Sequence, residues 1–251
     1  MLLINQERIT NYWEKRAGNY SEKIMTDMNS FKKEAWKEII TEYKGNDCSD
    51  ALDIGTGPGF FPIIMSELGF SVTGVDCSKE MINEAESNIN IAGYNATFSQ
   101  TDCHELPFED ESFDFIICRN LVWTLVSPDK AYKEWYRVLR KGGRLVVIDA
   151  NWFLRLSDDL SQKKYEQSQE RAREMGYLDK EITKNQQEEC NNIAKKLPLT
   201  YEKRPEWDKK SLLDVGFKNL NINEDITDKV YDNRQKVLYS YAPLFLISAE
   251  K

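Results

Sequence analysis

The residues best suited to bind a nucleoside form a glycine cluster followed by an isolated acid. Gly55, Gly57 and Gly59 follow an apolar run and precede a helical pattern. Glycine allows a tight turn there and leaves room for a ligand against the backbone. Asp76 ends the next apolar run, where a carboxylate could bind the two ribose hydroxyls of a nucleoside or cap the helix that follows Ser78. The spacing therefore predicts a nucleoside site at a strand-to-helix turn.

The glycine spacing distinguishes between several nucleotide-binding motifs. A dinucleotide fingerprint is Gly-x-Gly-x-x-Gly/Ala, whereas Phe60 occupies its sixth position here and the pattern is Gly-x-Gly-x-Gly. No Gly-Lys-Ser/Thr follows the cluster, so the sequence does not support a nucleoside triphosphatase. The spacing disfavours NAD but does not by itself decide between NAD and S-adenosylmethionine (SAM).

Short apolar runs alternate with helical patterns between residues 49 and 150. The strand candidates are 51–54, 71–75, 96–100, 113–118 and 144–149, and the helix candidates include 58–68, 79–92 and 128–140. Nearly continuous apolar runs are typical of parallel strands that are covered on both faces. The repeated units predict an α/β fold, with a Rossmann-like, doubly wound sheet of seven mostly parallel strands.

The segments outside this core are predicted to cover it. Residues 4–16 and 29–43 read as amphipathic helices, and residues 157–197 hold two charged helical patterns that start at Ser157 and Asp179. A helix at 208–215 and strands at 217–223 and 244–249 close the chain. We expect a single domain over residues 1–251, made of an N-terminal helical cover (1–45), a cofactor-binding core (46–150), a helical insertion that forms a lid after the fifth strand (151–207), and a C-terminal helix with two strands (208–251).

The composition disfavours several classes of partner. The 34 basic and 42 acidic residues give a net charge of −8, which repels a phosphate backbone, so we expect no nucleic-acid partner. No apolar run approaches the roughly 18 residues of a membrane span or suits a signal peptide. The five cysteines show no Cys-x-x-Cys pair, which argues against a disulfide framework or a metal site. A cytoplasmic protein with no metal is expected, and its oligomeric state is left open.

Five ordered segments resemble the motifs of class I SAM-dependent methyltransferases. They are residues 52–59 (LDIGTGPG), residues 74–78 (GVDCS) with Met81, residues 101–108 (TDCHELPF) with 112–114 (SFD), the pair Arg119-Asn120, and residues 135–145. The last segment is similar to the family's RVLKPGG post-motif but lacks the proline before Gly142. The resemblance is closest to small-molecule enzymes of the ubiquinone/menaquinone-biosynthesis type.

The resemblance implies a role for each matched position. The residues implied to hold SAM are Tyr20, Asp53, Gly55, Thr56, Gly57, Gly59, Asp76, Cys77, Met81, Asp102, Cys103 and Asn120. In these enzymes the glycines meet the methionine part of SAM, and Asp53 would fix the loop or the amino group. Asp76 would bind the ribose and Met81 would cover the adenine, whose amine would donate to Asp102.

Residues 12–20 (YWEKRAGNY) resemble the W-x-x-R-A-x-x-Y segment that folds over SAM in these enzymes. Tyr20 and Arg16 are therefore expected either to reach the SAM carboxylate or to pack as ordinary residues. His104 is the only histidine, and its place beside Asp102 favours a structural or adenine-side role over that of a general base. No catalytic residue is predicted.

The acceptor side is indicated by aromatic residues. Trp123 follows the fourth strand, and Trp152 with Phe153 follows the fifth, where loops border the ligand crevice of such sheets. These rings would either wall a substrate or belong to the core. The flanks of the insertion hold residues that could bind an anionic group or lie in solvent, namely Arg155, Arg204 and Trp207.

The predicted function is transfer of a methyl group from SAM to a small-molecule acceptor, with S-adenosylhomocysteine (SAH) as the product. Residues 120–124 lack the Asp/Asn-Pro-Pro-Tyr/Phe motif of enzymes that methylate nucleic-acid bases. Two alternatives stay open, a SAM/SAH-binding module without transfer activity and, disfavoured by Phe60, a nicotinamide-dependent oxidoreductase. The acceptor, the methylated atom and any general base are left open.

Overall fold

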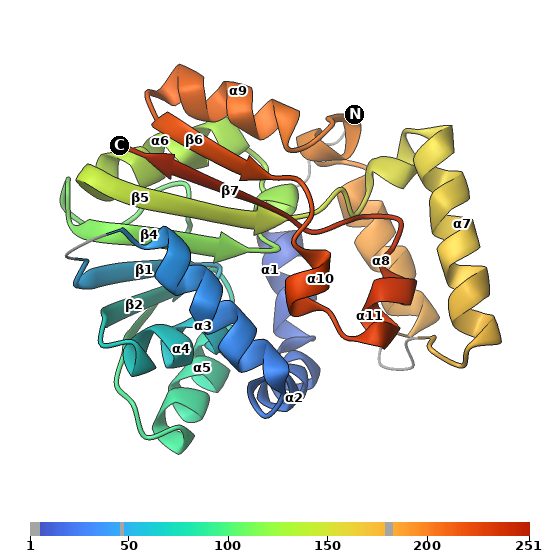
Figure 1. Ribbon diagram of the computed structural model, residues 1–251, viewed down its shortest axis with the longest axis horizontal. Helices are drawn as coiled ribbons and strands as arrows, with labels where there is room; N and C mark the ends of the chain where they lie inside the picture. Colours follow the sequence, from blue (N-terminus) through green and yellow to red (C-terminus); the bar gives the residue numbers. More distant parts are fainter. Residues whose placement is uncertain (1–5, 46–47, 179–182) are drawn as a thin grey trace.

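The apolar runs of the core form neighbouring strands of one sheet (Figure 1). The computed structural model describes residues 6–45, 48–178 and 183–251. Its strands are β1 (Asp50–Ile54), β2 (Ser71–Asp76), β3 (Thr97–Gln100), β4 (Phe113–Arg119), β5 (Leu139–Asp149), β6 (Lys218–Asn223) and β7 (Phe245–Glu250). In the order β3-β2-β1-β4-β5-β7-β6, the first five are parallel, and β7 pairs antiparallel with β5 and β6. The predicted Rossmann-like sheet of seven mostly parallel strands is confirmed.

Helices cover both faces of this sheet because successive strand residues point to opposite sides. Ala51 of β1 belongs to a core that includes residues of the helices α3 (Phe31–Tyr43), α4 (Phe60–Glu67) and α10 (Thr227–Val230). The next residue, Leu52, belongs to the opposite core, which includes residues of the helices α6 (Pro128–Val138) and α9 (Glu206–Val215). Both residues are fully buried, as expected for a strand covered on both faces.

Helix boundaries in the core follow local capping chemistry. The helix α5 (Lys79–Ile91) begins where predicted, because the Ser78 hydroxyl accepts the Met81 amide hydrogen and so satisfies a free helix-terminal donor. The helix α4 begins after Gly59, which adopts a left-handed conformation at its N-cap. The helix α6 ends at Val138 and passes directly into β5, so the predicted helical residues 139 and 140 lie in a strand.

The N-terminal cover contains one more helix than the sequence predicted. It consists of α1 (Gln6–Glu14), the unpredicted α2 (Ala17–Met28) and α3. The buried face of α2 is formed by Ala17, Ser21 and Ile24. The Asn88 side-chain amide of α5 donates to the Ser21 hydroxyl at 2.9 Å, which ties α2 to the core.

The insertion after β5 projects beyond the carboxyl ends of the parallel strands (Figure 1). It contains α7 (Asp159–Glu174) and α8 (Lys184–Ala194), and α7 contacts α11 (Asn233–Leu238) of the C-terminal part. The cap of α7 is Asp158 rather than the neighbouring Ser157, and its carboxylate accepts the Ser161 amide hydrogen at 2.7 Å. The predicted start of the second helix, Asp179, lies outside the described residues, and α8 is capped by Thr183.

Across the described ranges, no helix combines the length and the apolar character that a membrane span requires.

Candidate functional site

Two adjoining cavities lie where the parallel strands end. The first has a volume of about 70 Å³ and its lining residues are Gln6, Ile9, Trp13, Tyr20, Gly55, Gly57, Val75, Asp76, Cys77, Met81, Thr101, Cys103, Arg119, Asn120, Leu121, Thr124 and Leu125. The second has a volume of about 240 Å³ and shares Trp13, Tyr20, Arg119 and Asn120 with the first. Crevices at the carboxyl ends of strands are the usual ligand sites of open α/β sheets.

The glycine loop forms one wall of the first cavity. Gly55 has a φ of +69°, and a Cβ atom there would lie 2.8 Å from a methyl carbon of Leu121. Gly57 has a φ of +52°, and its Cβ would point toward Tyr20 and Met81, at 3.8 and 4.0 Å from their nearest atoms. Any side chain at Gly57 would therefore fill the cavity, whereas glycine leaves it free for a ligand.

Asp76 binds the glycine loop and faces the first cavity. Its carboxylate accepts amide hydrogens from Gly57 at 3.0 Å and from Ser78 at 2.9 Å. A carboxylate has about four acceptor positions, and Cys77 also hydrogen-bonds to this one, so ligand hydroxyls would share the acceptor positions with the loop. Burial raises the pKa of Asp76, and a donor from a ligand would favour its ionised form. Asp76 could therefore both cap the helix and bind a ribose, the two roles that the sequence predicted as alternatives.

A small hollow beside the loop is lined by Asp53, Thr56, Arg119 and their neighbours. Asp53 is 2% exposed, and burial raises its pKa to about 7. At the end of β4, Asn120 adopts a φ of +56°, and its side-chain oxygen is buried without a hydrogen-bond partner among the described residues. Such an acceptor needs a donor, and a polar ligand such as SAM would supply one, so the residues present fit the group.

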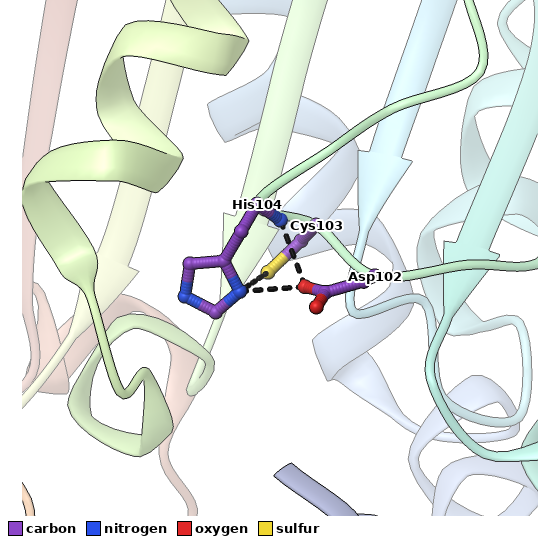
Figure 2. A group of neighbouring side chains, drawn as sticks. All are labelled: Asp102, Cys103 and His104. Atoms are coloured by element: carbon purple, nitrogen blue, oxygen red, sulfur yellow. Dashed lines mark hydrogen bonds and ion pairs between the residues drawn. The ribbon is translucent and has the colours of Figure 1, made fainter.

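Asp102, Cys103 and His104 form a compact turn after β3 (Figure 2). One carboxylate oxygen of Asp102 accepts the His104 backbone amide hydrogen at 2.9 Å and lies 2.5 Å from the imidazole Nδ1. This imidazole bond lowers the pKa of Asp102. The Cys103 sulfur lies 4.0 Å from the same Nδ1. Hydrogen bonding thus links Asp102 to His104, whose other ring nitrogen, Nε2, is buried without a hydrogen-bond partner among the described residues.

The structure brings most of the predicted SAM residues together. Eight of them line the first cavity, namely Tyr20, Gly55, Gly57, Asp76, Cys77, Met81, Cys103 and Asn120. Asp53 and Thr56 line the adjoining hollow. Gly59 and Asp102 line neither the first cavity nor the hollow. Gly59 is the N-cap of α4, and the Asp102 carboxylate binds His104. His104 is 5% exposed and lines neither cavity.

Several lining residues were not predicted to contact SAM. They are Gln6, Ile9, Trp13, Val75, Thr101, Arg119, Leu121, Thr124 and Leu125. Trp13 lies in the W-x-x-R-A-x-x-Y segment and Arg119 directly precedes Asn120, so the motifs contained a signal for these two. Gln6 and Ile9 of α1 carry no such signal, because amphipathic spacing identifies a buried face but not the ligand that the face covers.

The second cavity is rich in aromatic side chains. Both predicted acceptor-side residues, Trp123 and Trp152, line it, and eleven of its 23 lining residues are aromatic. The rings of Trp123 and Phe153 have centroids 4.6 Å apart. Because α7 and α8 contribute Tyr165, Gln187 and Cys190 to the wall, the inserted helices close part of this cavity.

A buried ionic network holds the two tryptophans in place. Asp149, at the end of β5, accepts the Trp123 amide hydrogen and the Trp152 indole hydrogen, each at 3.1 Å. It also accepts from Arg204 at 2.5 Å, and the same guanidinium donates twice to Asp208 at 2.8 Å. The network joins the end of β5 to residues 204–208, where the chain passes from the insertion into α9.

This network corrects the expectation for two of the three insertion-flanking residues. Arg204 is 4% exposed and lies between two carboxylates, so it is not available to an anionic ligand. Trp207 packs on the Tyr132 ring with centroids 6.1 Å apart. Of the three, Arg155 alone lines the second cavity.

Comparison with known proteins identifies the core. Residues 52–147 match the Methyltransferase domain family. The uncharacterized methyltransferase YcgJ of Bacillus subtilis is 38% identical over 99 residues, which are 39% of each chain. The ubiquinone/menaquinone biosynthesis C-methyltransferase UbiE of Bdellovibrio bacteriovorus is 32% identical over 148 residues, which are 58% of this chain and 63% of that one. The chain thus spans from about two fifths to just under two thirds of these relatives.

Two similarities extend over almost the whole chain. The uncharacterized protein MJ1123 of Methanocaldococcus jannaschii is 29% identical over 87% of both chains. The structure of a putative SAM-dependent methyltransferase from Methanococcus maripaludis has a TM-score of 0.61 at 24% identity, covering 95% of this chain and 93% of that chain. The matches give no support to a nicotinamide-dependent oxidoreductase. Residues 52–147, with the glycine loop and Asp76, therefore match the Methyltransferase domain family and are similar to SAM-dependent methyltransferases.

Proposed function

We propose that the protein transfers a methyl group from SAM to a small-molecule acceptor, with SAM in the first cavity and the acceptor in the second. The observation that carries this proposal is the junction between the cavities, where four residues line both: Trp13, Tyr20, Arg119 and Asn120. Two ligands held in these cavities would meet at that junction, as a transfer reaction requires.

The donor would be held by residues that already face the first cavity or the hollow. Asp76 would accept from the ribose hydroxyls, and Met81 would pack against the adenine. Asp53, buried beside the glycine loop, would face the amino group of the methionine part. The roles implied for Gly59 and Asp102 would be indirect, through the α4 cap and the His104 turn.

SAM supplies an electrophilic methyl carbon, which bonds to the acceptor nucleophile as the carbon–sulfur bond breaks and its electrons remain on sulfur, giving SAH. The chain's own contribution is alignment, which provides up to about 7–11 kcal/mol in well-oriented systems, and exclusion of water by the aromatic wall. His104 lies outside both cavities, so no general base is assigned.

The aromatic second cavity supports a small-molecule acceptor, and the acidic net charge of −8 disfavours nucleic acid. The cysteines of the described residues are free thiols, which supports a reducing, cytoplasmic setting. We further propose that residues 151–207 act as a lid and residues 1–45 as a cover over a single domain. Both segments contribute to the walls of the second cavity.

The first experiment compares thermal stabilisation by SAM, SAH and NAD. We expect SAM and SAH to raise the melting temperature and NAD to leave it unchanged, and a shift with NAD alone would overturn the proposal. The second experiment incubates the protein with methyl-labelled SAM and pooled metabolites and identifies labelled products by mass spectrometry. Binding of SAM without any labelled product from pools that yield products with other methyltransferases would favour a binding module.

A further inference from the structure

We propose that the acceptor is a ring-bearing anion whose charged oxygens bind Arg155 while its ring packs in the second cavity. This inference rests on the proposed function, since it names the class of molecule that would be methylated. It starts from one side chain, Arg155 of the short helix η2 (Leu154–Leu156), which lies in the wall of the second cavity.

Arg155 is a buried cation without an acidic partner. It is 7% exposed. One terminal nitrogen donates to the Asn191 side-chain oxygen at 2.6 Å, and the guanidinium carbon lies 4.2 Å from the Tyr165 ring centroid. Its Nε is buried with no hydrogen-bond partner, and no carboxylate in the described parts of the chain pairs with it. An uncompensated buried charge is unfavourable, so this arrangement suits an anion that completes it.

The other charges around the second cavity strengthen the case for an anion. Its wall holds five basic residues and one acid, namely Arg16, Lys23, Lys32, Arg119, Arg155 and Asp27. The acid is already engaged, because Asp27 lies 2.6 Å from the Lys32 amine, which also lies 3.0 Å from Asp232. Apart from that pair and Lys23, the charged residues of the wall are three arginines, Arg16, Arg119 and Arg155, within a protein whose net charge is −8.

The cofactor's own carboxylate does not account for Arg155. Arg119 lines the first cavity and the hollow beside Asp53 as well as the second cavity, so it is placed to meet the methionine carboxylate of SAM. Arg155 lines the second cavity but neither the first nor the hollow. A second anion, carried by the acceptor, is therefore the partner that Arg155 lacks.

The aromatic walls alone would suit either a ring or a cation, since cations bind over aromatic faces. Guanidinium groups already lie over four of these rings. Arg155 lies over Tyr165 at 4.2 Å and over Phe153 at 5.6 Å. Arg119 lies over Trp36 at 5.1 Å, and Arg16 lies over Tyr12 at 6.0 Å. A cationic acceptor would be repelled by them. A planar ring with an anionic oxygen group instead matches both features, because the ring stacks on aromatic walls and the fork of an arginine pairs with two oxygens.

The test measures charge preference in protein saturated with SAH. The probes are phenol-sized ring compounds, each prepared as a carboxylate, a phosphate ester, a carboxamide and an aminomethyl cation, and their dissociation constants are measured by ligand-observed NMR. We expect the anionic members to bind at least about tenfold more tightly than the matched amides, because charge-assisted hydrogen bonds are the stronger ones. The carboxylate and phosphate arms identify which oxyanion is preferred.

Three variants assign the preference to Arg155. Arg155→Gln should abolish it, Arg155→Lys should retain part of it through charge alone, and Arg171→Gln, on the exposed surface of α7, should leave it unchanged. Equal binding of anions and amides by wild-type protein, or a preference that survives in Arg155→Gln, would overturn the inference. If Arg155→Gln is unfolded by circular dichroism, Arg155→Lys decides, because an unaltered preference there contradicts the bidentate role.

The same samples separate this inference from the function on which it rests. SAH affinity is measured first by calorimetry. Absence of SAH binding counts against the methyltransferase proposal itself. Normal SAH binding without any preference for anionic rings counts against the role of Arg155 alone.

Discussion

Asp76 holds the glycine loop through both carboxylate oxygens and also lines the first cavity, and this makes its substitution informative. We predict that Asp76→Asn weakens SAH binding by about 1–3 kcal/mol, or about 5- to 150-fold, because a charged acceptor of buried hydroxyls is lost. The Gly57 and Ser78 amides bind different oxygens of this carboxylate, so asparagine keeps one of the two bonds, and the melting temperature of the ligand-free variant separates a disturbed loop from a lost ligand contact. Isothermal calorimetry provides the dissociation constants.

A matched control for Asp76 is Glu80→Gln, which removes an acid from the exposed start of α5. It should leave SAH affinity unchanged. If both variants bind SAH as tightly as the wild type does, the second motif was misinterpreted and the ribose lies elsewhere.

Asp53 gives the ligand-free protein a pH dependence of a definite sign. Burial raises its pKa to about 7 from the ordinary value of 3.8, so between these values the folded state binds a proton that the unfolded state has released. The contribution of Asp53 to stability therefore falls as the pH rises from about 4 to 7. Asp53→Asn lacks this dependence. We predict that its melting temperature relative to the wild type rises by several degrees between pH 5 and pH 8.

Scanning calorimetry of both proteins across that pH range provides the comparison for Asp53. A constant difference in melting temperature from pH 5 to pH 8 would show that this carboxyl has an ordinary pKa in the folded protein.

The sequence predicted the residues of the first cavity more completely than those of the second. Gly55, Asp76 and Asn120 each follow a strand, and parallel strands bring their carboxyl ends to one edge, so their convergence could be predicted. Tyr231 and Tyr239 in the second cavity follow short C-terminal helical segments that have no recognisable spacing. The tertiary fold brings such residues close to Trp152, and local sequence patterns do not predict this proximity.

At the scale of elements, α2 shows why a helix can escape prediction. Its buried face carries Ala17 and Ser21 as well as Ile24, so the apolar periodicity that identifies amphipathic helices is weak. Gly18 lies in its first turn and Arg16 provides no capping hydrogen bond, so start signals are missing too. Strands such as β4, whose buried run is almost continuous, were by contrast placed to within one residue.

The buried network around Arg204 should contribute strongly to stability. Arg204→Met leaves Asp149 and Asp208, both fully buried, without their shared cation. We predict a loss of about 3–5 kcal/mol in the free energy of unfolding, because breaking a buried pair leaves uncompensated charge. Urea denaturation followed by circular dichroism gives the value.

The control for Arg204 is Arg173→Met, which removes an exposed ion pair with Glu170 on α7. It should change stability by less than about 1 kcal/mol. If the two variants lose similar amounts of unfolding free energy, the network of Asp149, Arg204 and Asp208 contributes no more to stability than a surface ion pair does.

At the scale of the whole molecule, the N-terminal cover, the sheet edge and the insertion meet around one cavity. Within α7 just two residues are buried, Ser168 and Ala172, so opening of this helix would expose little buried surface. Ligands that contact Tyr165 and Arg155 should stabilise its closed position. We predict that trypsin cleavage in α7 slows about tenfold when the protein holds SAH and a ring carboxylate at about ten times its dissociation constant.

Mass spectrometry of timed digests resolves cleavage at Lys163 and Lys164 in α7 from cleavage at Lys209 and Lys210 in α9, all of them exposed. The α9 sites should be unaffected, since α9 packs on the sheet face opposite α3 and α4. If the two ligands leave the rate of cleavage in α7 unchanged, residues 151–207 do not act as a lid.

The overall architecture was predictable because strand–helix alternation leaves few arrangements for a parallel sheet. The order of the last two strands follows a different principle. The strand β7 inserts between β5 and β6, and its buried residues, including Leu246 and Ile247, require cover on both faces. The strand β6 lies at the edge of the sheet, where its polar residues can be partly exposed to solvent.

The distribution of the cavity walls along the chain has an evolutionary consequence. Twenty of the 23 residues that line the second cavity fall outside residues 52–147, the part shared with the Methyltransferase domain family. The inherited domain can therefore stay constant while the surrounding segments diverge toward new acceptors. Relatives that align only over residues 52–147 share the part of the chain that forms most of the first cavity. Similarity in the second cavity is better judged from chains such as MJ1123, whose similarity extends over 87% of both chains.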